Sequence, residues 1–225
     1  MTRKNWLQHE QPREKLLQKG ARYLSNTELL SVLFGSGSRQ KSVFDISHSL
    51  LEKFGSLTKL FNSDLSQCCQ QNGVGLAKYT QLQAAAELHC RYLKESLVDN
   101  PCLQNSSTVK QFLIAKLKSQ QREVFSCLFL DSHYRLIAFD TLFFGTINQS
   151  SIHLREIIKK ALHFNAAALI AAHNHPSGEA EPSHADKQIT KKLQQALRLI
   201  DIKLLDHIIV AGSKTFSFSE HGLLI

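Results

Sequence analysis

The first hundred residues carry hydrophobic side chains at the three- and four-residue spacing of amphipathic helices. Ser25 or Asn26 supplies an N-cap before one such segment, and Gly35 and Gly55 stand where two segments would end. This half of the chain therefore predicts an all-α unit of about five helices. They are expected at Thr27–Phe34, Ser42–Phe54, Leu57–Phe61, Leu65–Gln70 and Leu76–Tyr92.

The pattern changes after a polar, turn-rich stretch at residues 97–107, which contains Pro101 and is the predicted domain boundary. Beyond it, runs of β-branched and apolar residues alternate with helical segments. The expected strands are Val124–Leu130, Arg135–Phe144, Ala166–Ala172, Ile202–Ala211 and Thr215–Phe218, and the expected helices are Thr108–Lys118, Leu154–Phe164 and His184–Leu199. The chain thus predicts a helical domain over residues 1–100. Residues 101–225 predict an α/β/α layered domain with a mainly antiparallel sheet.

Composition narrows the class of protein. With 43% hydrophobic and 20% charged residues, the chain is ordinary for a soluble globular protein. No apolar run reaches the ~18 to 20 residues that cross a bilayer, and the charged segment Met1–Trp6 is not followed by the apolar stretch of a signal peptide. Five cysteines without a CxxC pair fit neither a disulfide framework nor a cysteine zinc site. We therefore expect a cytoplasmic protein with reduced thiols and no membrane partner.

The net charge of +8 raises the expectation of an acidic partner such as nucleic acid. Residues 1–100 carry 13 Lys+Arg against 9 Asp+Glu, and residues 101–225 carry 14 against 10, so each part contributes +4. Because no segment concentrates the charge, basicity alone does not identify a nucleic-acid-binding protein.

A candidate metal site follows the predicted strand Ala166–Ala172. His173 and His175 are two residues apart, so in an extended backbone both imidazoles point to the same side. A loop with proline and glycine then reverses the chain, and Asp186 returns a carboxylate from the first turn of the next predicted helix. Two imidazoles and one carboxylate leave a fourth tetrahedral position open, which is typical of a catalytic zinc site.

Two further residues complete a hydrolytic constellation. Glu123 opens the predicted strand Val124–Leu130 and is the candidate general base, which takes a proton from the attacking water and later gives it to the leaving amine. Ser183 lies three residues before Asp186 and can donate a hydrogen bond to a developing oxyanion.

Each of these residues also has a structural explanation. Histidine pairs such as His173 and His175 are common on surfaces. Ser183 with Asp186 makes a good N-cap with an acidic residue in the first turn, whether or not a metal binds. Glu123 alone resembles a solvated residue at a strand end. Spacing by itself leaves both interpretations open.

The pattern His173-x-His175-x7-Ser183-x2-Asp186, with a glutamate about fifty residues upstream, resembles the motif of JAMM (MPN-domain) metalloproteases. More narrowly, the chain resembles the RadC family over essentially its whole length. The residues that carry this resemblance are Arg122–Val124, Phe144–Thr146, Arg155–Glu156, Asn165–Ala168, His173–Gly178 and Leu205–Val210. The resemblance implies a JAMM/MPN-type fold and zinc on His173, His175 and Asp186. It also implies that Glu123 is the acid/base residue and that Ser183 assists at the oxyanion.

His207 also matches the family pattern. It lies on a predicted strand, and the sequence leaves open whether it supports a metal ligand or belongs to the core.

In the helical part, Gly73-Val74-Gly75 lies between two predicted helices and is followed by Lys78. A Gly-h-Gly turn that opens a helix directs backbone N–H groups outward, where they can bind a phosphate oxygen, and Lys78 can reinforce the contact. This resembles the hairpin of a helix-hairpin-helix module, which binds DNA backbone without reading sequence. The alternative is that the glycines only make a tight turn between helices.

A second glycine-rich segment, Gly35–Ser42, ends in Lys-Ser like a phosphate-binding loop. The second required glycine is Gln40 here, and no strand is predicted before the loop, so an NTPase is excluded.

The sequence therefore predicts a zinc-dependent hydrolase that cleaves a peptide or isopeptide bond in a peptide or protein substrate. The alternative is a DNA-associated protein whose helical domain contacts DNA phosphates non-specifically, in line with the DNA-repair label attached to the RadC family.

Overall fold

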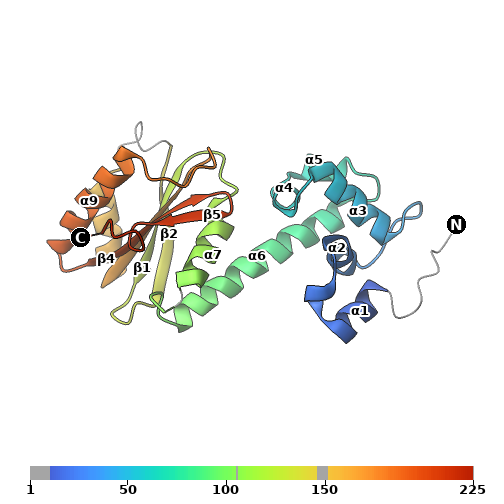
Figure 1. Ribbon diagram of the computed structural model, residues 1–225, viewed down its shortest axis with the longest axis horizontal. Helices are drawn as coiled ribbons and strands as arrows, with labels where there is room; N and C mark the ends of the chain where they lie inside the picture. Colours follow the sequence, from blue (N-terminus) through green and yellow to red (C-terminus); the bar gives the residue numbers. More distant parts are fainter. Residues whose placement is uncertain (1–10, 105, 146–151, 225) are drawn as a thin grey trace. The chain divides into compact units, whose positions relative to one another are not determined.

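The computed structural model describes residues 11–104, 106–145 and 152–224. The segment Met1–Trp6 and Thr146, both used in the sequence analysis, lie outside these residues. The chain forms two compact units, Met1–Leu88 and His89–Ile225 (Figure 1). Among the described residues, no helix is both long and apolar enough to span a bilayer.

The first unit is helical, as predicted. Its helices are α1 (Pro12–Lys19), the 3-10 helix η2 (Ala21–Tyr23), α2 (Asn26–Phe34), α3 (Val43–Phe54), α4 (Leu57–Phe61), α5 (Leu65–Cys69) and the first half of α6 (Leu76–Asp99). The core of this unit gathers Leu30, Phe34, Ile46, Leu50, Leu60, Cys68, Val74 and Leu82. The helix α1 was not among the predicted helices. It buries none of its residues and is mostly polar, so its sequence gives only a weak helical signal.

The two compact units divide inside α6, between Leu88 and His89. The helix runs to Asp99, seven residues past the predicted end at Tyr92. The reason is packing: Leu93 and Leu97 are buried in the core of the second unit. Propensity along the helix gives no sign of this change of core.

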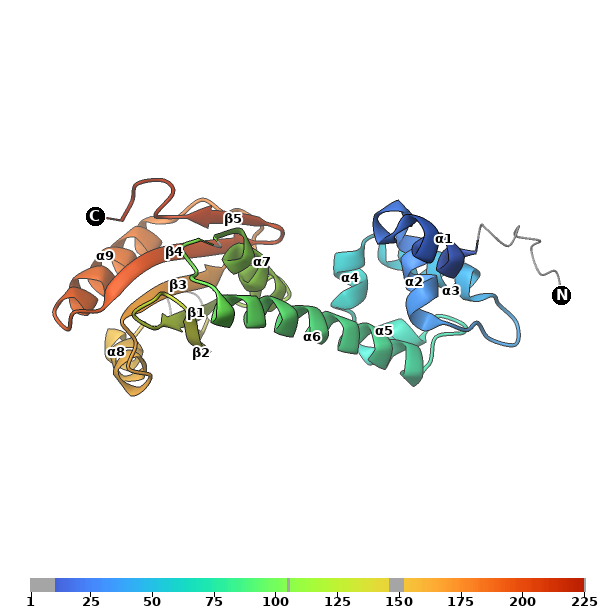
Figure 2. The same ribbon diagram turned by 90° about the horizontal axis from the view of Figure 1, so that it is seen from below.

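The second unit places a five-stranded sheet between two layers of helices (Figure 2). Its elements are α7 (Ser106–Leu117), β1 (Val124–Leu130), β2 (Leu136–Phe144), α8 (Leu154–His163), β3 (Ala168–Asn174), α9 (His184–Arg198), β4 (Lys203–Ala211) and β5 (Lys214–Ser217). The strand order is β2-β1-β3-β4-β5. Among the described strands, β3 and β4 alone are parallel, joined by a crossover through α9, and the other pairs are antiparallel. The predicted layered fold with a mainly antiparallel sheet is confirmed.

Each face of the sheet has its own core. On one face, α7 and the end of α6 cover β1, β3 and β4. Phe112 of α7, for example, belongs to the same cluster as Leu128 of β1 and Ile170 of β3. On the other face, α8 and α9 cover the alternate residues of the same strands, such as Phe129 and Leu169. Because β1 and β3 are buried on both sides along their whole length, they appear in the sequence as largely apolar runs.

The central strand β3 departs from its predicted bounds, which were Ala166–Ala172. It begins at Ala168, after a turn in which Asn165 has a φ of +50°, and continues to Asn174. The predicted strand ended with the apolar run, whereas the hydrogen-bonded strand carries the first polar residues of the candidate site. His173 pairs with Phe125 on β1 and with Ile209 on β4, so it is held from both sides.

Candidate metal centre

The candidate ligands come from the end of β3 and the start of α9. His173 lies inside β3, and His175 lies just beyond it, where its N–H donates to the carbonyl of Val210 at 2.8 Å. The backbone is still extended there, so the two imidazoles lie on the same side, as expected from their spacing. Asp186 is the third residue of α9, which begins after its N-cap Ser183.

The three side chains meet as predicted. The Nε2 atoms of His173 and His175 lie 2.9 Å apart, and Asp186 places Oδ1 3.2 Å from the first and Oδ2 3.5 Å from the second. Their ligand atoms form a group that could hold a metal ion. Zinc at its usual bond lengths in tetrahedral geometry separates two ligand atoms by about 3.3 Å. The observed separations, from 2.9 to 3.5 Å, lie on either side of that value.

The carboxylate of Asp186 gives a second sign that the site suits a cation. The residue is 1% exposed. Its Oδ2 accepts hydrogen bonds from the N–H of Ser183 at 2.7 Å and from the hydroxyl of Ser183 at 2.6 Å. Its Oδ1 is buried and accepts no hydrogen bond from the described residues, although Nε2 of His173 lies 3.2 Å away. A buried carboxylate oxygen without a donor is costly, and a metal ion on that side removes the cost.

The charges at the site favour the binding of a cation, because the protein itself places little positive charge there. Burial lowers the pKa of His173 and outweighs the opposing influence of Asp186. Contact with Asp186 raises the pKa of His175. Burial of Asp186 opposes its ionisation, but the two imidazoles and Ser183 hold its pKa well below the usual range. An ionised carboxylate therefore faces a neutral, fully buried imidazole, an arrangement that suits a divalent ion.

Glu123, the predicted general base, immediately precedes β1 and is partly buried. Phe125 pairs with His173 in antiparallel register, so continuing the register by two positions sets Glu123 opposite His175. Its negative charge acts on both imidazoles, in the same direction as Asp186. Its carbonyl accepts a hydrogen bond from the N–H of Gly145 at 2.8 Å, which fixes the backbone there.

Ser183, the predicted oxyanion residue, is exposed at the start of α9. Its hydroxyl accepts a hydrogen bond from the N–H of Asp186 at 3.1 Å and donates to Oδ2 of the same residue. In this arrangement the hydroxyl serves the helix cap and orients the candidate ligand.

Asn174 is a site residue that the sequence analysis did not single out. It is 2% exposed, and its side chain points to the opposite side from the two histidines that flank it. Its Oδ1 accepts from the N–H of Val124 at 2.8 Å, and its Nδ2 donates to the carbonyls of Gln120 and Arg122. Three hydrogen bonds thus hold the backbone on both sides of Glu123. The only sequence signal was the position of an asparagine between two histidines.

The structure also locates His207, whose role the sequence left open. It is fully buried on β4, and its Nε2 lies 2.8 Å from Nδ1 of His173. Its Nδ1 lies 2.6 Å from the hydroxyl of Thr190, which no motif had indicated. Burial and the neighbouring His173 lower the pKa of His207 well below its usual value.

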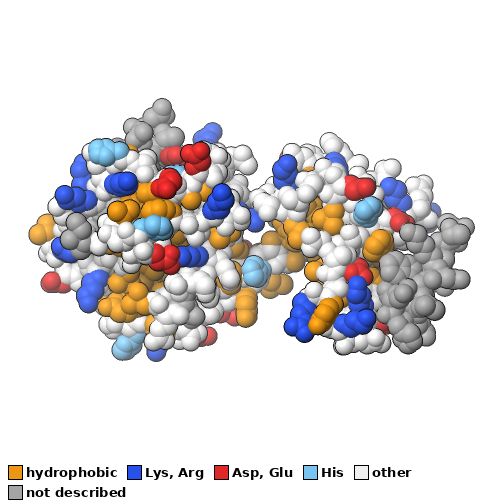
Figure 3. Space-filling view, viewed as in Figure 1, with side chains coloured by type: hydrophobic (Ala, Val, Ile, Leu, Met, Phe, Trp, Pro, Cys, Tyr) orange, Lys and Arg blue, Asp and Glu red, His pale blue; other side chains and the backbone are white. Residues whose placement is uncertain are grey.

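The Gly-Val-Gly turn of the helical unit lies between α5 and α6. Gly73 has a φ of +90°, and a Cβ there would meet Cδ1 of Ile46 at 2.6 Å, so the turn itself requires this glycine. Gly75 has no such requirement, since nothing lies within 4 Å of a Cβ at that position. Lys78 lies in the first turn of α6. On the face seen in Figure 3, lysine and arginine side chains are scattered among other types and form no single patch.

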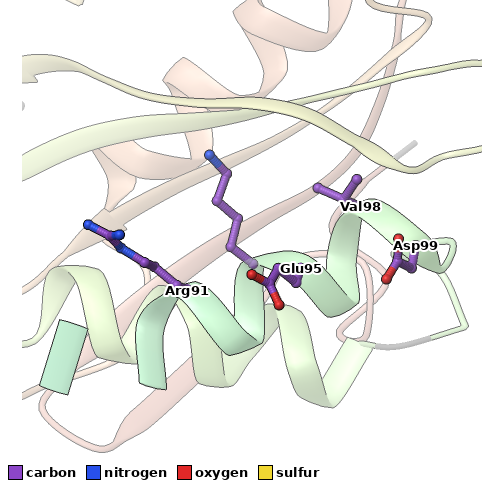
Figure 4. Close-up of a pocket in the computed structure, with 5 residues that line it drawn as sticks. Arg91, Glu95, Val98 and Asp99 are labelled. Carbon is purple, nitrogen blue, oxygen red and sulfur yellow. The ribbon is translucent and has the colours of Figure 1, made fainter. Parts of the chain in front are cut away.

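A surface hollow beside α6 shares no residue with the Gly-Val-Gly turn or with the candidate metal centre. It is lined by Arg91, Lys94, Glu95, Val98 and Asp99, all from that helix (Figure 4). Two basic and two acidic side chains balance one another there, and none belongs to the metal centre.

A largely antiparallel sheet between helical layers, with two histidines and an aspartate gathered at the end of its central strand, defines a domain of the JAB/MPN class. Residues 103–223 match the model of the RadC-like JAB domain, and residues 4–80 match that of the UPF0758 N-terminal domain. The chain belongs to the family of RadC-like JAB domain proteins.

Relatives resemble the chain over almost its full length. A UPF0758 protein of Nitrosococcus oceani is 51% identical over 220 residues, which is 98% of both chains. One of Thioalkalivibrio sulfidiphilus is 48% identical over 220 residues, again 98% of both. One of Nitrosospira multiformis is 47% identical over 224 residues, covering 100% of each chain. The family and its fold are therefore shown, and these names state no activity.

Proposed function

We propose that this chain is a zinc-dependent hydrolase that cleaves a peptide or isopeptide bond. The observation that carries the proposal is the buried Oδ1 of Asp186, which accepts no hydrogen bond among the described residues and lies 3.2 Å from Nε2 of His173, beside the Nε2 of His175, at separations close to those of tetrahedral zinc ligands. His173, His175 and Asp186 would hold the ion. A zinc ion with three protein ligands makes water acidic enough to ionise near neutral pH, and this is the chemistry it supplies.

The residues around the ligands would divide the remaining work. Glu123 would take a proton from the attacking water and deliver it to the nitrogen as the C–N bond breaks, so that the products are a carboxylic acid and an amine. Asn174 would keep Glu123 in place through its three backbone hydrogen bonds. Ser183 would donate to the developing oxyanion, for which its hydroxyl must exchange Oδ2 of Asp186 for the substrate oxygen.

The five cysteines suggest where the activity takes place. All of them lie among the described residues, and all are free thiols. The reducing cytoplasm maintains thiols in that form, so we place the hydrolase there.

The first test measures metal content. Purified wild type should contain about one zinc per chain by elemental analysis, and a His173→Ala/His175→Ala variant should contain none. A folded wild type that neither contains zinc nor takes it up from solution would refute the proposal.

The second test separates metal binding from chemistry. Zinc-loaded protein is incubated with a library of fluorogenic peptides and with a lysine ε-linked isopeptide. Glu123→Gln should keep its zinc and lose hydrolysis, because the amide cannot accept the proton. Full hydrolysis by this variant would exclude Glu123 as the acid/base residue.

A second candidate function rests on Gly75. We propose, as the alternative, that the helical unit contacts DNA phosphates through the backbone N–H groups that open α6. The supporting observation is that the turn requires Gly73 but leaves open space at Gly75, where a larger residue would hinder only a ligand. Gly75→Ala and Lys78→Glu should then weaken binding of duplex DNA without loss of stability or zinc, and binding should decrease with salt. Unchanged DNA binding in both variants would exclude this contact.

A further inference from the structure

The strongest unexplained feature of the α/β unit is the burial of His207. Its ring lies against Phe218, with centroids 4.9 Å apart, and against the edge of Phe125 at 5.6 Å. It is 0% exposed. A histidine enclosed in this way must satisfy both ring nitrogens within the protein. Both are satisfied, one by His173 and the other by Thr190.

The direction of these hydrogen bonds follows from Thr190. Its hydroxyl has a single proton, which it donates to the backbone carbonyl of Asp186 at 2.5 Å. A carbonyl oxygen can only accept. The hydroxyl oxygen must therefore accept from His207, whose Nδ1 carries a proton. Among the described residues, no carboxylate is hydrogen-bonded to the ring of His207 that would stabilise a second proton, so its Nε2 has a lone pair and accepts from Nδ1–H of His173.

This series of hydrogen bonds, from Asp186 through Thr190 and His207, sets the tautomer of His173. With its proton on Nδ1, the imidazole turns the lone pair of Nε2 towards His175 and Asp186. His175 reaches the same state by a different route, because its Nδ1 lies 2.7 Å from the carbonyl of Glu179, which can only accept. Two nitrogen lone pairs and a carboxylate then face one another.

We propose that Thr190 and His207 are positioning residues that fix His173 in the metal-binding tautomer. The chain of hydrogen bonds starts at the backbone of one proposed ligand, Asp186, and ends on another, His173. It therefore connects β4 and α9 to the ligand on β3. A histidine that only filled space in the core would not need to connect Asp186 with His173. The inference deepens the proposed function, and rests on its zinc-binding part.

The test compares Thr190→Val with Thr190→Ser. Valine keeps the volume and removes the hydroxyl, whereas serine keeps the hydroxyl. Zinc affinity is measured on the full chain by competition with a chromophoric chelator. Thr190→Val should bind zinc about 10- to 100-fold more weakly, as is usual when a partner behind a metal ligand is lost, and Thr190→Ser should restore the affinity.

Ser47→Ala provides a matched control in the helical unit. Ser47 is also fully buried, and its hydroxyl also donates to a carbonyl four residues earlier, that of Val43, and bonds to one further side chain, Ser31. Its loss should reduce thermal stability as much as Thr190→Val does and leave zinc affinity unchanged.

A spectroscopic measurement tests the tautomer directly. In metal-free protein labelled with 15N, the ring nitrogens of His173 should show a proton on Nδ1 and none on Nε2. Thr190→Val and His207→Gln should change this pattern. If zinc affinity and the His173 tautomer both stay as in wild type in Thr190→Val, the proposal is overturned and His207 is a packing residue.

The outcomes also separate this inference from the hydrolase proposal. Weakened zinc binding in Thr190→Val without any peptide cleavage by wild type would support the positioning role and count against the hydrolase. Peptide cleavage by wild type with unchanged zinc affinity in Thr190→Val would support the hydrolase and count against the positioning role. If wild type takes up no zinc, the hydrolase falls, and the metal-free tautomer measurement alone decides the positioning role.

Discussion

Two helices of this chain, one in each unit, begin with the same N-terminal device. Ser25 caps α2 and Ser183 caps α9, and in each case an acidic side chain three residues later closes a capping box. Both acids are buried, Glu28 at 8% and Asp186 at 1% exposure. In sequence the two boxes are nearly interchangeable, Ser-x-x-Glu and Ser-x-x-Asp.

What differs is the group that faces the carboxylate. Lys15 donates to both oxygens of Glu28, at 2.8 and 2.9 Å, and thereby supplies a cation from the chain itself. Two imidazoles face Asp186 instead, and one of its oxygens accepts no hydrogen bond within the described part of the chain. The first box has its counter-charge within the protein, whereas the second would obtain one from the proposed metal ion. The comparison indicates that tertiary neighbours decide whether a helix cap can serve as a binding site.

The largest difference should appear in zinc binding. Asp186→Asn keeps the shape of the cap but removes the charge, so we expect zinc affinity to fall by more than the ~100-fold typical of residues behind the ligands. Glu28→Gln, the equivalent change in the other box, should leave zinc affinity as in wild type. Chelator competition measures both. Similar zinc affinity in the two variants would contradict the distinction between the boxes.

Zinc should also stabilise the two units unequally. A ligand at about 100 times its Kd stabilises the state that binds it by about 2.7 kcal/mol. Hydrogen exchange followed by mass spectrometry resolves the units, and added zinc should slow exchange in β3 and α9 and leave α2 and α3 unchanged. Equal protection of both units would show that zinc does not bind at Asp186.

These contrasts also show what the sequence reveals. The layered fold could be predicted because β1 and β3 are largely apolar runs and α8 and α9 are strongly amphipathic. The meeting of the candidate ligands could be predicted because alternation in an extended chain is a local rule that puts His173 and His175 on one side. That rule gives no information on which oxygen of Asp186 lacks a donor.

The rest depends on contacts between distant segments. The proposed roles of Thr190 and His207 depend on β4 lying beside β3, with α9 packed against the sheet. Asn174 forms hydrogen bonds with a segment some fifty residues earlier. The end of α6 is a similar case, since Leu93 and Leu97 belong to the core of the second unit although they continue a helix of the first. No local pattern encodes such neighbours.

The helical unit should lose stability when the positive charge of Lys15, which faces the capping box of α2, is removed. Lys15→Met leaves the buried Glu28 without its charged donor, and we expect a loss of about 1–3 kcal/mol in the free energy of unfolding of the helical unit. Burial opposes ionisation of Glu28, but Lys15 and Ser25 hold its pKa below the usual 4.5. A lowered pKa in the folded state stabilises the fold above pH 4.5, and this contribution disappears as pH falls through the folded-state pKa.

Urea unfolding of wild type and Lys15→Met at neutral pH and near pH ~3 therefore provides the measurement, since most carboxyl groups are protonated at the lower value. The difference in stability should shrink on acidification, because the wild type loses the contribution that the variant already lacks. A difference independent of pH would mean that Lys15 acts by packing and not through the carboxylate.

The smallest effects should come from the two cap serines. Ser25→Ala and Ser183→Ala each remove a hydroxyl that accepts from the N–H of the acid, at 3.2 and 3.1 Å, so each should cost about 1 kcal/mol of stability. Only Ser183→Ala should also weaken zinc binding, because the hydroxyl of Ser183 donates to Oδ2 of Asp186 and orients the carboxylate. Thermal unfolding and chelator competition on the same samples measure the two effects. If both alanines lower stability alike and neither changes zinc affinity, the cap of α9 is structural and only its carboxylate belongs to the site.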